Sequence, residues 1–93
     1  MRISFDPAKR DHVLAERQLD FTDAEKLFAD FHITRPDHRH SDVEDRFISV
    51  GVVGNGVLIV VWTEREQERR IVTMWKANER ERTAYWRERV RSG

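Results

Sequence analysis

The chain contains no cysteine, so it can form neither a disulfide framework nor a thiolate metal site, and it has no thiol nucleophile. The N-terminus lacks the apolar stretch of a secretory signal peptide. The longest apolar run, residues 57–62, is far too short to span a bilayer. Internal repeats and low-complexity segments are also missing. These absences favour a cytoplasmic protein that does not enter the membrane.

Charged residues are abundant, at 37% of the 93 residues, and the apolar residues come in blocks. Such blocks form a core, so we expect a single folded domain over residues 1–93 and not a disordered chain. The net charge is zero, yet residues 1–63 carry a charge of −3 and residues 64–93 a charge of +3. A local positive field can attract a polyanion even when the whole molecule is neutral. The alternative is that Glu and Arg alternate on a solvated helix.

The periodicity of apolar residues predicts the element order β-α-α-β-β-β-α, with a possible extra strand near Ile33. The second helix should begin with a capping box in which Thr22 is the N-cap and Glu25 the third helical residue. Asn78 is the expected N-cap of the last helix. The expected strands cover residues 2–5, 46–53, 57–63 and 69–75, and the first and last helices cover residues 8–17 and 78–90.

Short turns join the last three predicted strands, which must therefore be antiparallel. Residues 54–56, Gly-Asn-Gly, are typical of a hairpin turn, and the polar residues 34–45, which include Pro36, are typical of a loop. Residues 57–63 form the most hydrophobic run and should be the central strand, covered on both faces. An antiparallel sheet with its helices against one face is an α+β fold in two layers.

Five segments in collinear order carry a resemblance: residues 5–9, 19–28, 44–51, 60–65 and 70–85. They resemble the corresponding segments of BrnT-type toxins, a family of the RelE/ParE-like superfamily. The resemblance implies a RelE-like fold and a ribonuclease toxin of a type II toxin–antitoxin pair, which inhibits growth by cleaving RNA until it is neutralised. It also implies a BrnA-like ribbon-helix-helix antitoxin that represses the operon, so that operator DNA is contacted only indirectly, through the antitoxin.

Two positions depart from the family pattern. Glu16 and Arg17 stand where the family usually has Lys-His, and Trp75 stands where it usually has an arginine. Lys76 can replace that arginine only in part, because an ammonium group cannot make the two-pronged contact of a guanidinium. The departure at Trp75 supports a second interpretation, in which the chain is a catalytically weakened binding module that grips the antitoxin and acts in operon repression.

Cleavage of RNA through its own 2′-hydroxyl requires a base, cations that stabilise the charge developing on the phosphate, and an acid for the leaving oxygen. Enzymes can supply most of this by electrostatics and positioning, so we expect neither a metal nor another cofactor. The alternative for each charged residue is a solvated surface role. The predicted catalytic residues are Arg65, Lys76, Glu81 and Tyr85. The predicted RNA-binding residues are Arg46, Arg69, Arg70 and Arg80.

The tryptophans and histidines offer further candidates. Trp75 and Trp86 flank the basic helix and are predicted to bind the antitoxin, because tryptophan is frequent in the energetic centres of interfaces. The alternative is that they stack on unpaired bases. His38, His40 and Asp42 have the spacing of metal ligands, but no second cluster of ligands accompanies them. A solvated loop is therefore favoured there, with a general base at His38 or His40 as a further alternative.

Overall fold

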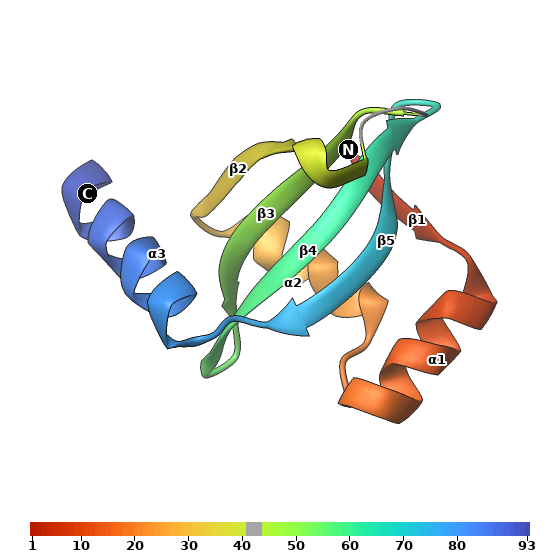
Figure 1. Cartoon of the computed structure of the whole chain (residues 1–93), viewed down its shortest axis with the longest axis horizontal. Coiled ribbons are helices and arrows are strands. Elements are labelled where there is room, and N and C mark those ends of the chain that lie inside the picture. The colour runs from red at the N-terminus through yellow and green to blue at the C-terminus, as the bar shows by residue number, and fades with distance from the viewer. Residues whose placement is uncertain (41–43) are drawn as a thin grey trace.

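A five-stranded sheet forms the centre of the computed structural model, which describes residues 1–40 and 44–93. Its spatial order is β1-β5-β4-β3-β2 (Figure 1). The strands are β1 (Arg2–Phe5), β2 (His32–Asp37), β3 (Arg46–Val53), β4 (Gly56–Arg65) and β5 (Glu68–Lys76). The helices are α1 (Pro7–Arg17), α2 (Ala24–Ala29) and α3 (Glu79–Ser92), with 3₁₀ turns η1 (Phe21–Asp23) and η2 (His38–His40).

The sheet is mixed, so the prediction of a purely antiparallel sheet is wrong. Strands β2 to β5 pair antiparallel with their neighbours, and the expected extra strand near Ile33 is present as β2. Strand β1 instead pairs parallel with β5. The short-turn argument applies only to β3, β4 and β5. Most of the chain separates β1 from β5, and a connection of that length allows parallel pairing.

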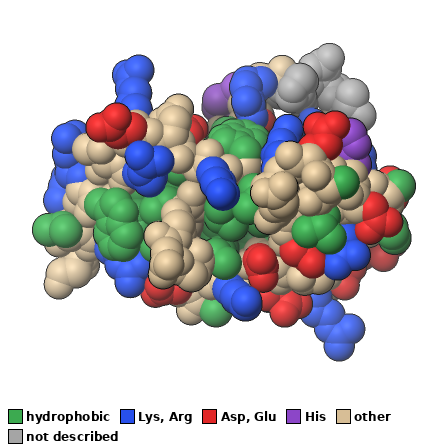
Figure 2. Space-filling view, turned by 90° about the horizontal axis from the view of Figure 1, so that it is seen from below, with side chains coloured by type: hydrophobic (Ala, Val, Ile, Leu, Met, Phe, Trp, Pro, Cys, Tyr) green, Lys and Arg blue, Asp and Glu red, His purple; other side chains and the backbone are tan. Residues whose placement is uncertain are grey.

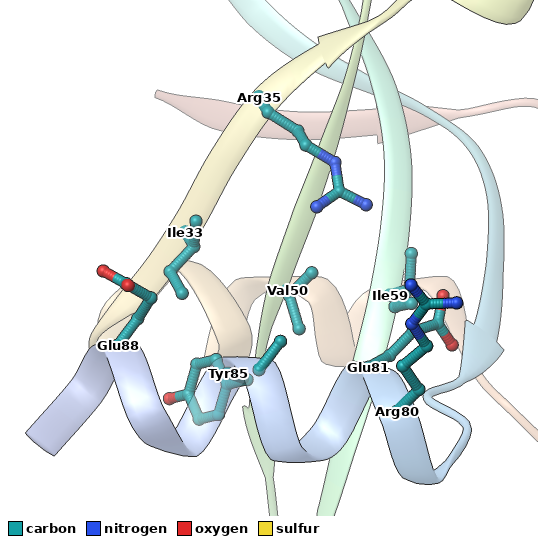
Figure 3. Close-up of a pocket in the computed structure, with 9 residues that line it drawn as sticks. Ile33, Arg35, Val50, Ile59, Arg80, Glu81, Tyr85 and Glu88 are labelled. Carbon is teal, nitrogen blue, oxygen red and sulfur yellow. The ribbon is translucent and has the colours of Figure 1, made fainter.

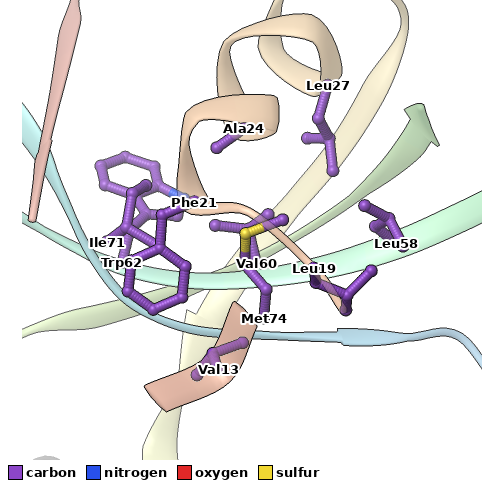
Figure 4. Close-up of a cluster of buried hydrophobic side chains, with 10 residues drawn as sticks. All are labelled: Val13, Leu19, Phe21, Ala24, Leu27, Leu58, Val60, Trp62, Ile71 and Met74. Carbon is purple, nitrogen blue, oxygen red and sulfur yellow. The ribbon is translucent and has the colours of Figure 1, made fainter. Parts of the chain in front are cut away.

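Helices cover both sides of the sheet, so the expectation of two layers with all helices on one face is also wrong. Helices α1 and α2 pack on the side that carries Val60 and Met74, here called the covered face (Figure 4). Helix α3 packs on part of the side that carries Ile59 and Val61, here called the open face (Figure 1). Strand β4 is buried from Val57 to Thr63. This confirms the prediction that the most hydrophobic strand is covered on both faces.

Two local predictions differ from the structure. The segment predicted as a loop is strand through Asp37, and Pro36 is accommodated because β2 is an edge strand, where a missing N–H is tolerated. The capping box at Thr22 is wrong: the Asp20 carboxylate accepts the Thr22 N–H at 3.1 Å and begins η1, and α2 begins only at Ala24. Asp20 therefore makes the first cap, the turn that follows it is 3₁₀, and α2 begins one residue later than the predicted start at Asp23.

Other local predictions are confirmed. A hairpin joins β3 to β4 around Gly54, which has a φ of 60°. Asn78 is the N-cap of α3, and its side chain accepts the Glu81 N–H.

Within the described part of the chain, no helix is long and apolar enough to cross a membrane.

Candidate functional site

Four cationic side chains gather around a small cavity at one end of the open face. They come from α1, β3, β4 and β5 and are called the cationic cluster: Lys9, Arg46, Arg65 and Arg70. The cavity has a volume of about 110 Å³. Side chains two residues apart on a strand face the same side, so Arg46 lies on the side of Ile48, and Arg65 on that of Val61. Three of the four residues were predicted from the sequence as catalytic or RNA-binding.

Two carboxylates lie with the four cations, which leaves the cluster with a charge of +2. Glu44 makes ion pairs with Arg65 at 3.3 Å and with Arg46 at 3.8 Å. Asp6 is engaged elsewhere, because its carboxylate accepts the N–H of Ala8 as the N-cap of α1. A positive cluster in a partly enclosed cavity concentrates the electrostatic field and attracts anions.

Among the described residues, part of the cationic cluster is not paired with a carboxylate. Arg70 and Lys9 form no ion pair within residues 1–40 and 44–93, although both line the cavity. The Arg46 Nε atom is buried and lacks a hydrogen-bond acceptor there, since 3.8 Å to Glu44 is too long for a hydrogen bond. A buried donor without an acceptor is costly. An anion with several oxygen atoms would supply acceptors for these donors.

A second cavity, of about 260 Å³, lies between α3 and the open face (Figure 3). Its apolar floor comes from the sheet strands, at Ile33, Val50 and Ile59. Arg35 extends from β2 above this floor, and Arg80 extends from the first turn of α3 (Figure 3). The predicted RNA-binding residue Arg80 therefore lies at this groove and outside the cationic cluster.

Two predicted catalytic residues at the groove are engaged in holding α3. The Tyr85 hydroxyl donates to the Phe31 carbonyl at 2.9 Å and accepts from Arg89 at 2.8 Å, and Tyr85 is only 1% exposed. The Glu81 carboxylate accepts the N–H of Asn78 at 2.8 Å and completes a capping box. Both groups have a clear structural use, and their catalytic roles stay predictions.

Lys76 and Arg65 lie at opposite ends of the β4–β5 ladder. Arg65 is opposite Glu68, whereas Lys76 is opposite Leu58, seven residues back along β4. At about 3.3 Å per residue, this places the two positions roughly 23 Å apart. Leu58 belongs to the covered face, whereas Arg65 belongs to the open face. The two residues therefore do not form one phosphate site.

Arg69, predicted to bind RNA, lies on the covered face. Its guanidinium carbon is 3.9 Å from the centre of the Phe28 ring and 5.1 Å from that of Trp62. Burial lowers the pKa of Arg69. This residue is separated from Arg46, Arg65 and Arg70 by the thickness of the sheet.

Asp37 and Arg39, which were not predicted from the sequence as site residues, form a charged pair on the open face. The Asp37 carboxylate accepts both Arg39 Nε at 2.8 Å and Arg39 Nη2 at 3.0 Å, and the pairing raises the pKa of Arg39. Asp37 is 4% exposed. The Arg39 guanidinium also lies over the Trp75 ring at 5.7 Å. An aspartate two residues before an arginine was the only signal, and it gives no indication of burial.

The remaining candidates are placed as follows. Trp75 is half-buried on the open face, and Trp86 is 47% exposed with its ring against Tyr85. His38 is exposed in η2, whereas Asp42 lies outside the described residues. No metal-binding group of His, Asp or Glu is present among residues 1–40 and 44–93. In the view of Figure 2, acidic and basic side chains are interspersed and hydrophobic side chains lie exposed between them.

Comparison with known proteins gives one family. The sequence model of a family described as the ribonuclease toxin BrnT of type II toxin–antitoxin systems matches residues 5–81. The matched segment extends from the end of β1 into the first turn of α3 and includes all four residues of the cationic cluster. Comparison with curated proteins gives no match.

Proposed function

Since this chain belongs to the BrnT family of ribonuclease toxins of type II toxin–antitoxin systems, we propose that it is an endoribonuclease that cleaves RNA in the cytoplasm without a metal ion. Its fold is proposed to be RelE-like. A BrnA-like ribbon-helix-helix antitoxin neutralises it, and the complex contacts operator DNA only through that antitoxin. Growth stops when the antitoxin is absent.

The cationic cluster is the observation that carries this proposal. A phosphodiester presents anionic oxygens, and arginine guanidinium groups bind them with two parallel hydrogen bonds. Arg46, Arg65 and Arg70 converge from three adjacent strands on one cavity, with a charge of +2 once Lys9 and the two carboxylates are included. Rigid strands are better than loops at holding such groups in place before the substrate arrives.

The proposed chemistry is transfer of the phosphoryl group within the RNA strand. The 2′-oxygen attacks the adjacent phosphorus, and the bond from phosphorus to the 5′-oxygen breaks. The products are a 2′,3′-cyclic phosphate and a 5′-hydroxyl. The 2′-hydroxyl loses its proton to solvent, and the leaving 5′-oxygen gains one from solvent. Arg46, Arg65 and Arg70 stabilise the negative charge that grows on the non-bridging oxygens, which is the largest contribution in many enzymes.

Expression of the chain alone in bacteria tests this function. The unaltered chain should stop growth and degrade cellular RNA, and Arg65→Ala should relieve both effects. Arg91→Ala is the matched control, because Arg91 is also an exposed arginine in one ion pair with a glutamate, at 2.9 Å from Glu88, but lies at the end of α3. Normal growth with intact RNA, despite good expression of the unaltered chain, would sink the proposal.

We propose that Trp86 contributes to the antitoxin interface. Its ring is 47% exposed, and the Arg89 guanidinium lies over it at 5.6 Å. An exposed tryptophan beside an arginine is typical of the residues that contribute most to binding. Co-expression with the product of a neighbouring ribbon-helix-helix reading frame should yield a complex, and Trp86→Ala should weaken it. Recovery of the same amount of complex with Trp86→Ala as with the unaltered chain would contradict this role.

The second candidate function is a weakened binding module that grips the antitoxin and tunes repression. It is favoured by one residue: Trp75 places a ring, and no charge, on the open face opposite Ile59. The discriminating variant is Trp75→Arg. A gain in RNA cleavage would support a weakened enzyme, whereas strong cleavage by the unaltered chain would rule the module out.

A further inference from the structure

We propose that Arg39 contacts the phosphate at which the RNA is cleaved, and that Asp37 and Trp75 hold its guanidinium group in position. This inference rests on the proposed ribonuclease function and adds a residue that the cationic cluster does not contain. Arg39 lies in η2, which follows β2 directly and passes over the open face (Figure 1).

Arg39 lies between the cationic cluster and the groove. Its anchor, Asp37, is paired directly with Arg46 of the cluster across β2 and β3. Its aromatic neighbour, Trp75, is paired with Ile59 of the groove floor across β4 and β5. Since Arg39 contacts both Asp37 and Trp75, its guanidinium bridges the space between the two cavities. A strand of RNA that entered both cavities would pass Arg39.

The Arg39 guanidinium is fixed before any substrate binds. Asp37 accepts its Nε and Nη2 groups and also the Arg39 backbone N–H at 3.2 Å. The Asp37 side chain is 1% exposed, so this carboxylate is a rigid base for the pair. A guanidinium that is already ordered loses little side-chain entropy when it binds a ligand. Such preorganised donors are the ones that stabilise a transition state most.

The Arg39 side chain still has donors available. A guanidinium group carries five N–H groups, and Asp37 takes two of them. The remaining three have no acceptor within residues 1–39 and 44–93, and the side chain is 58% exposed, so they are open to solvent. A phosphate oxygen can therefore accept from Arg39 without breaking its contact with Asp37. The Asp37–Arg39 pair has no net charge, so long-range attraction of the RNA comes from the cationic cluster. Arg39 instead supplies directed hydrogen bonds.

Arg10 provides a structural comparison for Arg39. It makes the same two-pronged contact, with Asp20 at 3.0 and 2.8 Å, but it lies in α1 and binds η1 on the covered side. A third donor of Arg10 is taken by Asp11 at 3.3 Å. Arg10 therefore makes the same two-pronged ion pair at a position away from the open face, where it only links two elements of the fold. Arg10→Ala is the matched control for the loss of such an ion pair.

The test is cleavage of a short unstructured RNA by the purified full chain under single-turnover and steady-state conditions. Arg39→Ala should lower kcat by about 100-fold or more, the usual effect of losing one directed donor, with little change in KM. Arg39→Lys should be similarly slow, because an ammonium group cannot contact Asp37 and phosphate with the same geometry. Free guanidinium ion should restore part of the activity of Arg39→Ala. Arg10→Ala should keep its kcat and show no such response.

The positioning role of Asp37 is tested by Asp37→Asn, which should lower kcat more than it raises KM, because an amide oxygen cannot accept both prongs. The inference is overturned if Arg39→Ala, or Arg39→Lys should the alanine variant fail to fold, cleaves as fast as Arg10→Ala. A slow Arg39→Ala that guanidinium does not restore would also overturn it. Absence of cleavage by the unaltered chain is a different result, since it contradicts the ribonuclease function itself.

Discussion

Tyr85 lies where α3 meets the start of β2, and its hydroxyl links the Phe31 carbonyl to Arg89. Arg89 in turn pairs with Asp30 at 3.2 Å. This short network attaches an otherwise polar helix to the sheet. A phenol in this position has both of its hydrogen-bonding roles filled by the protein. At the scale of single residues, we therefore propose that the chemistry depends on the cations of the cationic cluster.

Tyr85→Phe separates the structural use of the phenol from a catalytic one. The ring stays packed, but the Phe31 carbonyl and Arg89 lose a partner, so the free energy of unfolding should fall by about 1 kcal/mol. RNA cleavage should stay unchanged. Urea denaturation and a cleavage assay on the same preparation measure both. A loss of cleavage at full stability would instead restore Tyr85 as an acid or base.

The placement of single residues was predictable from sequence only where a strand sets the direction of the side chain. Arg65 was predicted to be catalytic and Arg46 and Arg70 to bind RNA, and these three side chains do line one cavity. Arg39 was not identified, because the burial of Asp37 depends on β2 continuing through Pro36. Such burial depends on tertiary pairing and not on local pattern.

At the scale of elements, α3 depends on its capping box for its start. Asn78→Ala removes the acceptor for the Glu81 N–H and should lower the free energy of unfolding by roughly 0.5–2 kcal/mol. Glu81→Gln is the control, because glutamine can also complete the box. It should keep both stability and RNA cleavage. If Glu81→Gln folds normally but no longer cleaves RNA, then Glu81 acts as an acid or base after all.

The close packing of α2 on β3 depends on Gly51. A Cβ atom at this position would lie 2.8 Å from Leu27 Cγ, whose side chain is completely buried. Gly51→Ala should therefore lower the free energy of unfolding by about 1–3 kcal/mol. Gly56→Ala is the matched control, because nothing lies within 4 Å of a Cβ atom there. Equal stability of the two variants in thermal denaturation would mean that α2 can move away without cost.

Elements were predictable where local sequence decides them. The hairpin at Gly54, the central strand β4 and the cap at Asn78 follow from turn chemistry, hydrophobic runs and capping preference. The direction of β1 was not predictable, because its partner β5 lies at the other end of the chain. The separation of Lys76 from Arg65 likewise depends on strand register, which the sequence leaves open.

At the scale of the whole molecule, two carboxylates make the free energy of unfolding depend on pH. Hydrogen bonds from Arg10 lower the pKa of Asp20 well below its usual range, and the Phe31 N–H and then Arg89 lower the pKa of Asp30. A lowered folded-state pKa adds stability that is present above the unfolded value and lost as pH falls through the folded value. The free energy of unfolding should therefore decline below a pH of about 4. Asp20→Asn should make that decline shallower in denaturation series, and an unaltered slope would contradict the assignment.

The central claim is that RNA cleavage takes place at the cationic cluster on the open face of the sheet. The most direct measurement is the single-turnover rate of cleavage of one short RNA by Arg46→Ala, Arg65→Ala, Arg70→Ala, Lys76→Ala and Arg91→Ala. Each cluster variant should be slower by about 100-fold, whereas Lys76→Ala and Arg91→Ala should match the unaltered chain. Loss of cleavage in Lys76→Ala, with normal rates in the three cluster variants, would contradict the account.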